Sequence, residues 1–394
     1  MESELNNKIN YNLKRSIIFG SFAFGFMSFI LPIYTKEIGG NALSIGGLFS
    51  IFSIVTLILR PLIGRGLDIY GRKNFFASSF IFYAISMILF SYSTNTILLY
   101  ASRSIQAIGS SLMWISAYSI ATDISDNKEI GSSIGKVDSA YTKGSLYGSI
   151  IGFTILGNFA LLNGWSIIFK VYAVSSIVAG YIAYKYIPET FQIDIEKNEK
   201  FDKKSNHNFN KLLVIVFISS VSSSMLSPLL MIYLQDRFNT NIKILALAFI
   251  PATLVYAFLP QIFGGISDKI GRIPPMIIGL VISSIVSFGF TSASSIKILI
   301  VLWVLESIGL VMSSPAEESL VSDIVNKNIR GYAYGIYLAI ASLGSAIGPL
   351  IGGWLYDSFG HVLPFYINGV MLLLNAILIG VLFKNYKVVP KKST

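Results

Sequence analysis

Twelve apolar stretches follow one another along this chain of 394 residues, and each has roughly the 20 residues that a helix needs to cross a bilayer. Because the hydrocarbon layer holds no water to satisfy backbone N–H and C=O groups, each crossing stretch must be helical. The stretches cover residues 16–36, 43–64, 75–94, 97–121, 135–159, 166–187, 211–234, 243–264, 275–294, 297–320, 333–356 and 364–384. The pattern predicts an all-α integral membrane protein with twelve transmembrane helices.

Composition agrees with this prediction and excludes several classes of site. Hydrophobic residues make up 53% of the chain and charged residues 13%, with a mean hydropathy of +0.67, outside the range of a water-soluble domain. The chain has no cysteine, so thiolate metal sites and disulfides are excluded, and both histidines, His207 and His361, fall in predicted loops. We therefore expect no metal and no cofactor.

The distribution of Lys and Arg predicts the orientation. With a cytoplasmic N-terminus, 23 of the 30 basic residues fall in cytoplasmic ends and loops, five fall outside and two fall inside spans. This predicts a multi-pass protein of the cell (inner) membrane with both termini in the cytoplasm. The net charge of +10 is then spread along the anionic leaflet, so nucleic acid is not an expected partner.

The polar segment 64–73, Gly-Arg-Gly-Leu-Asp-Ile-Tyr-Gly-Arg-Lys, recurs 200 positions later at 264–273, again between two apolar stretches. The same offset relates Gln106 to Glu306 and Asp123 to Asp323. A charged segment of alternating sign lies between the two copies. The repeat predicts an N-terminal six-helix bundle at 1–190, a cytoplasmic linker at 191–210, and a C-terminal six-helix bundle with a short tail at 211–394.

With GxxxDxxGR(K) after the second span and RxxQxxG in the fourth, the chain resembles the major facilitator superfamily over nearly its whole length. The resemblance implies two pseudo-symmetric six-helix bundles around a central cavity, alternating access, and a functional monomer. It also implies a cytoplasmic gate made by Gly64, Asp68, Gly71, Arg72, Lys73, Asp123, Gly264, Asp268, Gly271, Arg272 and Asp323.

Physical reasoning gives compatible roles to the charged members of this gate. Asp68 is placed to accept hydrogen bonds from a helix N-terminus, and Arg72 to pair with Asp123 at the inner end of the fourth span. Asp268, Arg272 and Asp323 repeat the set. The alternative is a pair of loops whose charges merely fix topology, which leaves the repetition of Asp123 and Asp323 unexplained.

Ionisable groups inside the spans are candidates for a substrate and proton cavity, because a charge at the bilayer centre costs at least about 2.5–3.5 kcal/mol. Glu306 lies near the middle of the tenth span. A carboxyl group that alternates between buried and wet surroundings can bind and release protons, so Glu306 is the predicted coupling acid. Its alternative role is to pair with a cationic side chain.

Arg103, Gln106 and Lys143 complete the predicted cavity. Arg103 and Gln106 share a face of the fourth span, where handling of substrate or protons and plain packing are both open. Lys143, midway along the fifth span, suits an anionic substrate or a partner for Glu306. Glu317 and Glu318 lie nearer the cytoplasmic end, where functional and packing roles are again both open.

We expect a secondary transporter rather than an enzyme, since the chain shows neither a GxxxxGK[ST] nucleotide loop nor a nucleophile–base set. Resemblance to efflux branches favours proton-coupled export of small organic or amphipathic compounds. A first alternative is a proton-coupled importer of a carboxylate or sugar-like solute. A second is a non-transporting membrane sensor or a lipid translocator. The expected partners are a small-molecule substrate, protons and the lipid bilayer.

Overall fold

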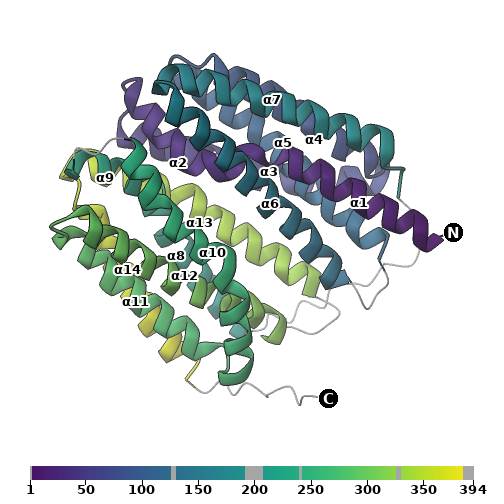
Figure 1. Cartoon of the computed structure of the whole chain (residues 1–394). Coiled ribbons are helices and arrows are strands. Elements are labelled where there is room, and N and C mark those ends of the chain that lie inside the picture. The colour runs from purple at the N-terminus through teal and green to yellow at the C-terminus, as the bar shows by residue number, and fades with distance from the viewer. Residues whose placement is uncertain (1, 126–129, 191–206, 239–241, 325–329, 385–394) are drawn as a thin grey trace. The chain divides into compact units, whose positions relative to one another are not determined.

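The structure, a computed structural model, describes residues 2–125, 130–190, 207–238, 242–324 and 330–384, and these residues are almost entirely helical (Figure 1). The helices of the N-terminal half are α1 (Glu2–Gly20), α2 (Phe22–Glu37), α3 (Ala42–Tyr70), α4 (Lys73–Ser91), α5 (Thr96–Asp123), α6 (Ile130–Asn158) and α7 (Leu161–Tyr186). Those of the C-terminal half are α8 (His207–Leu226), α9 (Leu229–Phe238), α10 (Ile242–Ile270), α11 (Ile273–Ser292), α12 (Ile296–Ile324), α13 (Arg330–Phe359) and α14 (Leu363–Leu382).

Each of the twelve predicted spans corresponds to one helix or to a consecutive helix pair, which confirms the all-α prediction for the described residues. Within the part of the chain that the structure describes, ten candidate spans are long and apolar enough to cross a membrane, counting α1 with α2 and α8 with α9 as single spans. The other two predicted spans are α5 and α6, with 28 and 29 residues, which carry more polar and charged side chains. Three of the four candidate cavity residues, Arg103, Gln106 and Lys143, lie on these two helices, and Glu306 lies on α12.

Two of the predicted spans are interrupted in the structure. α8 and α9 are separated at Ser227 and Pro228, where proline removes a backbone donor and clashes with the preceding turn. α1 and α2 are separated at Ser21, where Gly144 and Gly148 of α6 come against the backbone of the junction. The apolar pattern alone predicted neither break.

The chain forms two compact units. The first comprises Met1–Gly40 and Ile51–Asn198, and the second comprises Asn41–Ser50 and Glu199–Thr394. The predicted linker, 191–210, lies mostly outside the described residues. Both units therefore follow the two halves of the repeat, except for one short segment at the start of α3.

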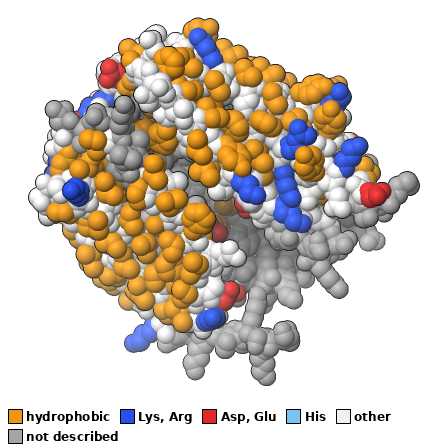
Figure 2. Space-filling view, viewed as in Figure 1, with side chains coloured by type: hydrophobic (Ala, Val, Ile, Leu, Met, Phe, Trp, Pro, Cys, Tyr) orange, Lys and Arg blue, Asp and Glu red, His pale blue; other side chains and the backbone are white. Residues whose placement is uncertain are grey.

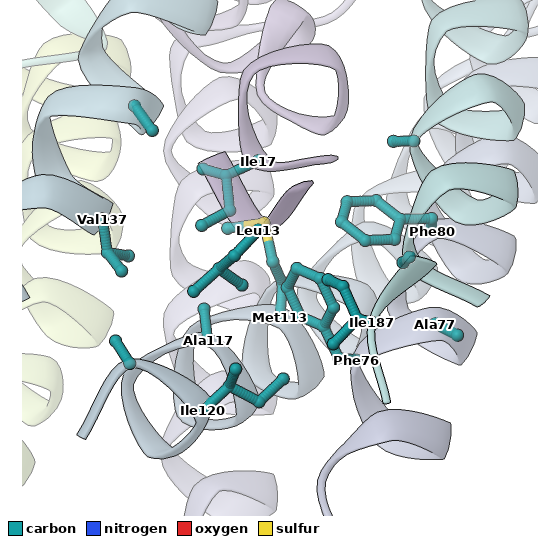
Figure 3. Close-up of a cluster of buried hydrophobic side chains, with 14 of the residues drawn as sticks. Leu13, Ile17, Phe76, Ala77, Phe80, Met113, Ala117, Ile120, Val137 and Ile187 are labelled. Carbon is teal, nitrogen blue, oxygen red and sulfur yellow. The ribbon is translucent and has the colours of Figure 1, made fainter. Parts of the chain in front are cut away.

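The core of the first unit brings together side chains from α1, α4, α5, α6 and the end of α7 (Figure 3). Leu13 and Ile17 of α1 and Phe76 of α4 are fully buried there. The second unit has a matching cluster that joins α8, α11, α12, α13 and α14. These clusters fix the helices that carry the candidate site.

The segment Asn41–Ser50 belongs to the second unit because it packs on α13. The backbone N–H groups of Ala42 and Leu43 donate to the two carboxylate oxygens of Asp357, at 3.1 and 2.8 Å. An acidic side chain at a helix N-terminus satisfies donors that have no partner within the helix. Asp357 thus caps the first turn of α3.

Apolar side chains cover much of the visible surface, while Lys and Arg side chains gather where Figure 1 places the N-terminus (Figure 2). Large side chains such as Phe258, Ile285 and Val381 are among the most exposed. A soluble monomer rarely exposes apolar area on this scale. The protein is therefore a multi-pass membrane protein whose apolar outer faces suit contact with lipid.

Candidate functional site

The α3–α4 hairpin positions the first copy of the repeated motif. α3 ends at Tyr70, and Gly71 takes a positive φ of 87°, a conformation that glycine adopts without strain. A Cβ at this position would also collide with the carboxylate of Glu189. The turn aims Arg72, the residue before α4, back along the end of α3.

Arg72 and Asp123, which the sequence predicted to pair, lie together at the end of α5. The Arg72 Nε donates to Asp123 Oδ2 at 3.1 Å, and a terminal guanidinium nitrogen donates to the Leu67 carbonyl at 2.6 Å. The side chain of Asp68 lies outside the described residues, so its predicted helix-capping contact stays a prediction. At Gly64 an added Cβ would meet nothing within 4 Å, so packing within the described residues does not require glycine there.

Glu189 and Thr190, just after α7, complete this cluster and were not among the predicted site residues. Glu189 accepts hydrogen bonds from the backbone N–H groups of Arg72, at 2.8 Å, and Lys73, at 3.2 Å. The Thr190 hydroxyl donates to Asp123 Oδ2 at 2.9 Å. The end of α7 thereby caps α4 and joins α5. The predicted span 166–187 ended just before this cluster, but spacing gave no sign of which helix Glu189 would cap.

Lys73 contributes in a second way. Its ammonium group lies 5.2 Å from the centre of the Tyr184 ring on α7, within the range of a cation–π contact. The predicted gate lysine therefore helps to hold α4 against α7.

The second copy of the motif repeats this geometry in the α10–α11 hairpin. Gly271 has a φ of 92°, and Arg272 Nε donates to Asp323 Oδ2 of α12 at 2.9 Å. Other guanidinium contacts reach Ser267 Oγ at 2.7 Å and Asp268 Oδ1 at 2.5 Å. Gly264, the counterpart of Gly64, faces Pro315 at ordinary van der Waals distance.

Arg272 lies at the hairpin between two spans. Burial acts to lower its pKa, but hydrogen bonds and charge from Asp323 and Asp268 outweigh this, so the pKa is raised above its ordinary value. The guanidinium is therefore a permanent cation that holds the ends of α10 and α12 together.

The two hairpins differ in how they satisfy the helix that follows. In the first, Glu189 accepts from the N-terminus of α4. In the second, Pro274 and Pro275 follow Ile273, the first residue of α11; they lack backbone N–H groups and so remove two of the unsatisfied donors. Equivalent helix ends in the two halves thus solve the same hydrogen-bonding problem in different ways.

Two predicted cavity residues, Arg103 and Gln106, lie side by side on α5 in the first unit. A terminal nitrogen of Arg103 donates to Gln106 Oε1 at 2.5 Å, and the guanidinium carbon lies 4.3 Å from the centre of the Phe52 ring. Gln106 is fully buried, and its Nε2 has no hydrogen-bond partner among the described residues. Lys143 of α6, by contrast, is exposed rather than buried.

Glu306 is buried on α12, with 9% of its surface exposed. α12 approaches α11 closely one turn later, where a Cβ on Gly309 would lie 2.7 Å from the carbonyl oxygen of Gly279. This contact brings the Ser283 hydroxyl to the Glu306 backbone carbonyl, at 3.5 Å. Tyr256 of α10 lies within electrostatic range of the Glu306 carboxyl group. The carboxyl group is therefore held inside the second unit.

Glu317, for which the sequence left a functional role and a solvated or packing role both open, is half-buried and accepts a hydrogen bond from the Tyr337 hydroxyl at 3.2 Å. Glu318 beside it is exposed. The described residues contain no group of three or more His, Asp and Glu side chains placed to hold a metal ion. The chemistry that these units offer is charge pairing, hydrogen bonding and proton binding.

Comparison with known proteins gives a consistent result. A family described as Major Facilitator Superfamily matches residues 16–206 and 212–394. Multidrug resistance protein 2 of Bacillus subtilis is 23% identical over 389 residues, covering 95% of each chain. A PmrA homologue of Lactococcus lactis, a multidrug resistance efflux pump, is 24% identical and covers 97% of this chain and 98% of the relative. The nucleoside transporter NupG has a similar fold, with a TM-score of 0.81 at 14% identity, covering 95% of this chain and 100% of that chain.

Proposed function

Since this membrane transporter belongs to the Major Facilitator Superfamily, we propose that it exports small amphipathic organic compounds in exchange for protons, by alternating access. The relatives that carry multidrug-resistance names support export. The family supports a mechanism in which two bundles alternately open a central site to either side of the membrane.

Burial of Glu306 is the observation that carries the proton-coupling part of the proposal. A carboxyl group inside a membrane helix is costly, whether it is charged or must find a hydrogen-bond partner. Its counterpart 200 positions earlier, Gln106, cannot ionise. The second unit therefore holds a titratable group where the first unit holds a neutral amide, and proton binding at this position is the step that couples transport to the gradient.

The two arginine–aspartate pairs supply the gating part of the proposal. Arg72–Asp123 joins the α3–α4 hairpin to the end of α5 in the first unit. Arg272–Asp323 joins the α10–α11 hairpin to the end of α12 in the second unit. Held in this way, each hairpin is fixed to its own bundle, as the proposed gating requires. Lys143 is left outside this mechanism because it is exposed within its unit.

The proposal places the protein in the cell (inner) membrane with both termini in the cytoplasm, acting as a monomer. The concentration of Lys and Arg in the loops assigned to the cytoplasm supports this orientation.

The test measures accumulation of ethidium and of Hoechst 33342 in cells that express wild type, Glu306→Gln, Glu306→Asp or Glu318→Gln, with and without a proton uncoupler. Wild type should lower accumulation of at least one dye, and the uncoupler and Glu306→Gln should each abolish that effect. Glu306→Asp keeps an ionisable group and should retain part of the activity.

Glu318→Gln is the matched control, because it removes the same charge from an exposed position on the same helix and should behave as wild type. Equal export by wild type and Glu306→Gln would refute the role of Glu306. Higher dye accumulation in wild type would show import, and a change in leaflet composition without dye flux would show lipid translocation.

A further inference from the structure

Glu317 lies on α12 eleven positions after Glu306 and six before Asp323. Eleven residues make just over three helical turns, so the two carboxyl groups share a face and are separated by about 16 Å along the axis. Ala316 and Leu320, on either side of Glu317, belong to the buried core of the second unit. A second carboxyl group therefore enters the same bundle, nearer the end that carries the arginine pair.

The groups around Glu317 come from three other helices. The Tyr337 hydroxyl of α13 donates to Glu317 Oε1 at 3.2 Å, and the Ser219 hydroxyl of α8 lies close enough to the carboxyl group to interact with it. Asn375 of α14 contacts Ser219 in turn. Among the described residues, Glu318 on the same helix is a charged group near this carboxyl.

Asn375 fixes the direction of the hydrogen bond that Ser219 makes. The Asn375 Nδ2 group donates one hydrogen to the Ile215 carbonyl oxygen at 3.2 Å and contacts Ser219 Oγ at 2.8 Å. A carbonyl oxygen can only accept, so the atom facing Ile215 must be the amide nitrogen. Ser219 therefore accepts from Asn375, which leaves its own hydrogen free to point at Glu317.

The hydroxyl groups around Glu317 differ from the arginine partners of Asp123 and Asp323 in their ability to accept hydrogen bonds. Each aspartate faces an arginine, which can only donate and never loses its proton, so it stabilises the ionised carboxylate alone. Tyr337 and Ser219 can both donate and accept. When Glu317 takes a proton from water, its new O–H can donate to a hydroxyl oxygen while that hydroxyl turns its own hydrogen elsewhere. Both protonation states of Glu317 can thus be satisfied in place.

We propose that Glu317 is a second proton-binding residue of this transporter, held by Ser219, Tyr337 and Asn375, and that it loads and unloads during the cycle driven through Glu306. Its part in that cycle rests on the proposed proton-coupled export. Its binding of a proton does not, and this allows the two ideas to fail separately.

The test of proton binding uses the full-length purified protein without substrate. Infrared difference spectra between high and low pH show the C=O stretch of each carboxyl group that gains a proton. Subtracting the Glu317→Gln spectra from those of wild type isolates the band of Glu317. The same subtraction with Glu318→Gln isolates the band of Glu318, an exposed neighbour. We expect the Glu317 band to titrate at a pH different from that of Glu318.

Tyr337→Phe provides a second variant that keeps Glu317 and the packing of the ring. It removes one donor from the ionised form, so the Glu317 band should appear at a higher pH than in wild type. A residue with a merely structural role would give no such shift. The proposal is overturned if the wild-type minus Glu317→Gln spectrum contains no band at any pH, or if the band titrates together with that of Glu318 and ignores Tyr337→Phe.

The transport arm measures the pH profile of uncoupler-sensitive ethidium efflux. Loss of one titration step in Glu317→Gln supports a place in the cycle, and an unchanged profile overturns it. If wild type moves no dye, the proposed export fails, while the infrared band still decides whether Glu317 binds a proton.

Discussion

Arg272 contacts two carboxylates whose surroundings differ, and this difference predicts unequal interaction energies. Arg272 pairs with Asp268 at 2.5 Å and with Asp323 at 2.9 Å. Distance alone would make the Asp268 pair the stronger one. Burial reverses that order, because 65% of the Asp268 side chain is exposed against 20% of Asp323 and 10% of Arg272. We expect the Asp323 pair to contribute more to stability.

The expected magnitudes follow from exposure. Asp268 and Arg272 are four residues apart at the end of a helix, and such solvent-exposed pairs contribute about 0.3–0.5 kcal/mol. The bond from Arg272 to Asp323 is charge-assisted and largely shielded from water, which corresponds to about 1.5–3 kcal/mol. The two coupling energies should therefore differ roughly threefold or more.

Two double-mutant cycles measure these energies, one with Arg272→Ala and Asp323→Asn and the other with Arg272→Ala and Asp268→Asn. The free energy of unfolding of the purified protein is followed in mixed micelles with increasing SDS. Trp303 of α12 reports from the second unit, where both pairs lie. Raising the salt concentration should reduce the Asp268 coupling while leaving most of the Asp323 coupling.

A coupling energy for Asp268 equal to or larger than that for Asp323 would refute the reasoning, since distance would then outweigh burial. A coupling near zero in both cycles would show that the hairpin is held by its backbone contacts alone. In that case the Arg272–Asp323 ion pair could not be what holds the α10–α11 hairpin to the end of α12.

Three further predictions concern helix contacts. Glu189→Gln should weaken the cap of α4 by about 1 kcal/mol, seen as faster amide hydrogen exchange in its first turn with the rest of the first unit unchanged. Gly309→Ala should lower the thermal midpoint because its Cβ meets backbone and overpacking costs about 1–3 kcal/mol, whereas Gly335→Ala, with open space around it, should raise it slightly. Trp165→Phe should cost about 0.5–1.5 kcal/mol in SDS unfolding, because the Phe90 carbonyl loses the indole N–H that donates to it at 2.5 Å and keeps the Ser93 N–H at 3.1 Å; a stability equal to that of wild type would contradict this.

The features that could be predicted from the sequence are those with a repeating signal. Apolar length located each span, since the bilayer imposes both length and helicity. The 200-residue offset relates Arg72 to Arg272 and Asp123 to Asp323. A pairing predicted in one half was therefore predicted in the other half as well. Helix ends were less predictable, as most described helices continue past the apolar stretch into polar residues that no hydropathy pattern marks.

Contacts between helices distant in the chain left no such signal. Glu189 reaches the start of α4 from 117 positions away, and Asn375 reaches Ser219 from 156. Nothing in the spacing of these residues distinguishes them from other polar side chains near a span. The exposure of Lys143 was unpredictable for a related reason: position along a span gives depth in the membrane but not the face of the helix.

Divergence between the halves yields one more prediction. The arginine–aspartate pairs are retained in both halves, while positions 106 and 306 differ, with an amide in one half and a carboxyl group in the other. Gln106 already accepts from Arg103 at 2.5 Å. In the double variant Gln106→Glu, Glu306→Gln the carboxyl group would therefore meet a permanent cation and stay ionised. We expect this exchange to leave dye export as low as in Glu306→Gln, although the number of buried carboxyl groups at these two positions is unchanged. Restored, uncoupler-sensitive export would show that any buried carboxyl group suffices. If the double variant expresses and folds normally but does not export dye, coupling needs a carboxyl group whose neighbours allow it to lose and regain its proton.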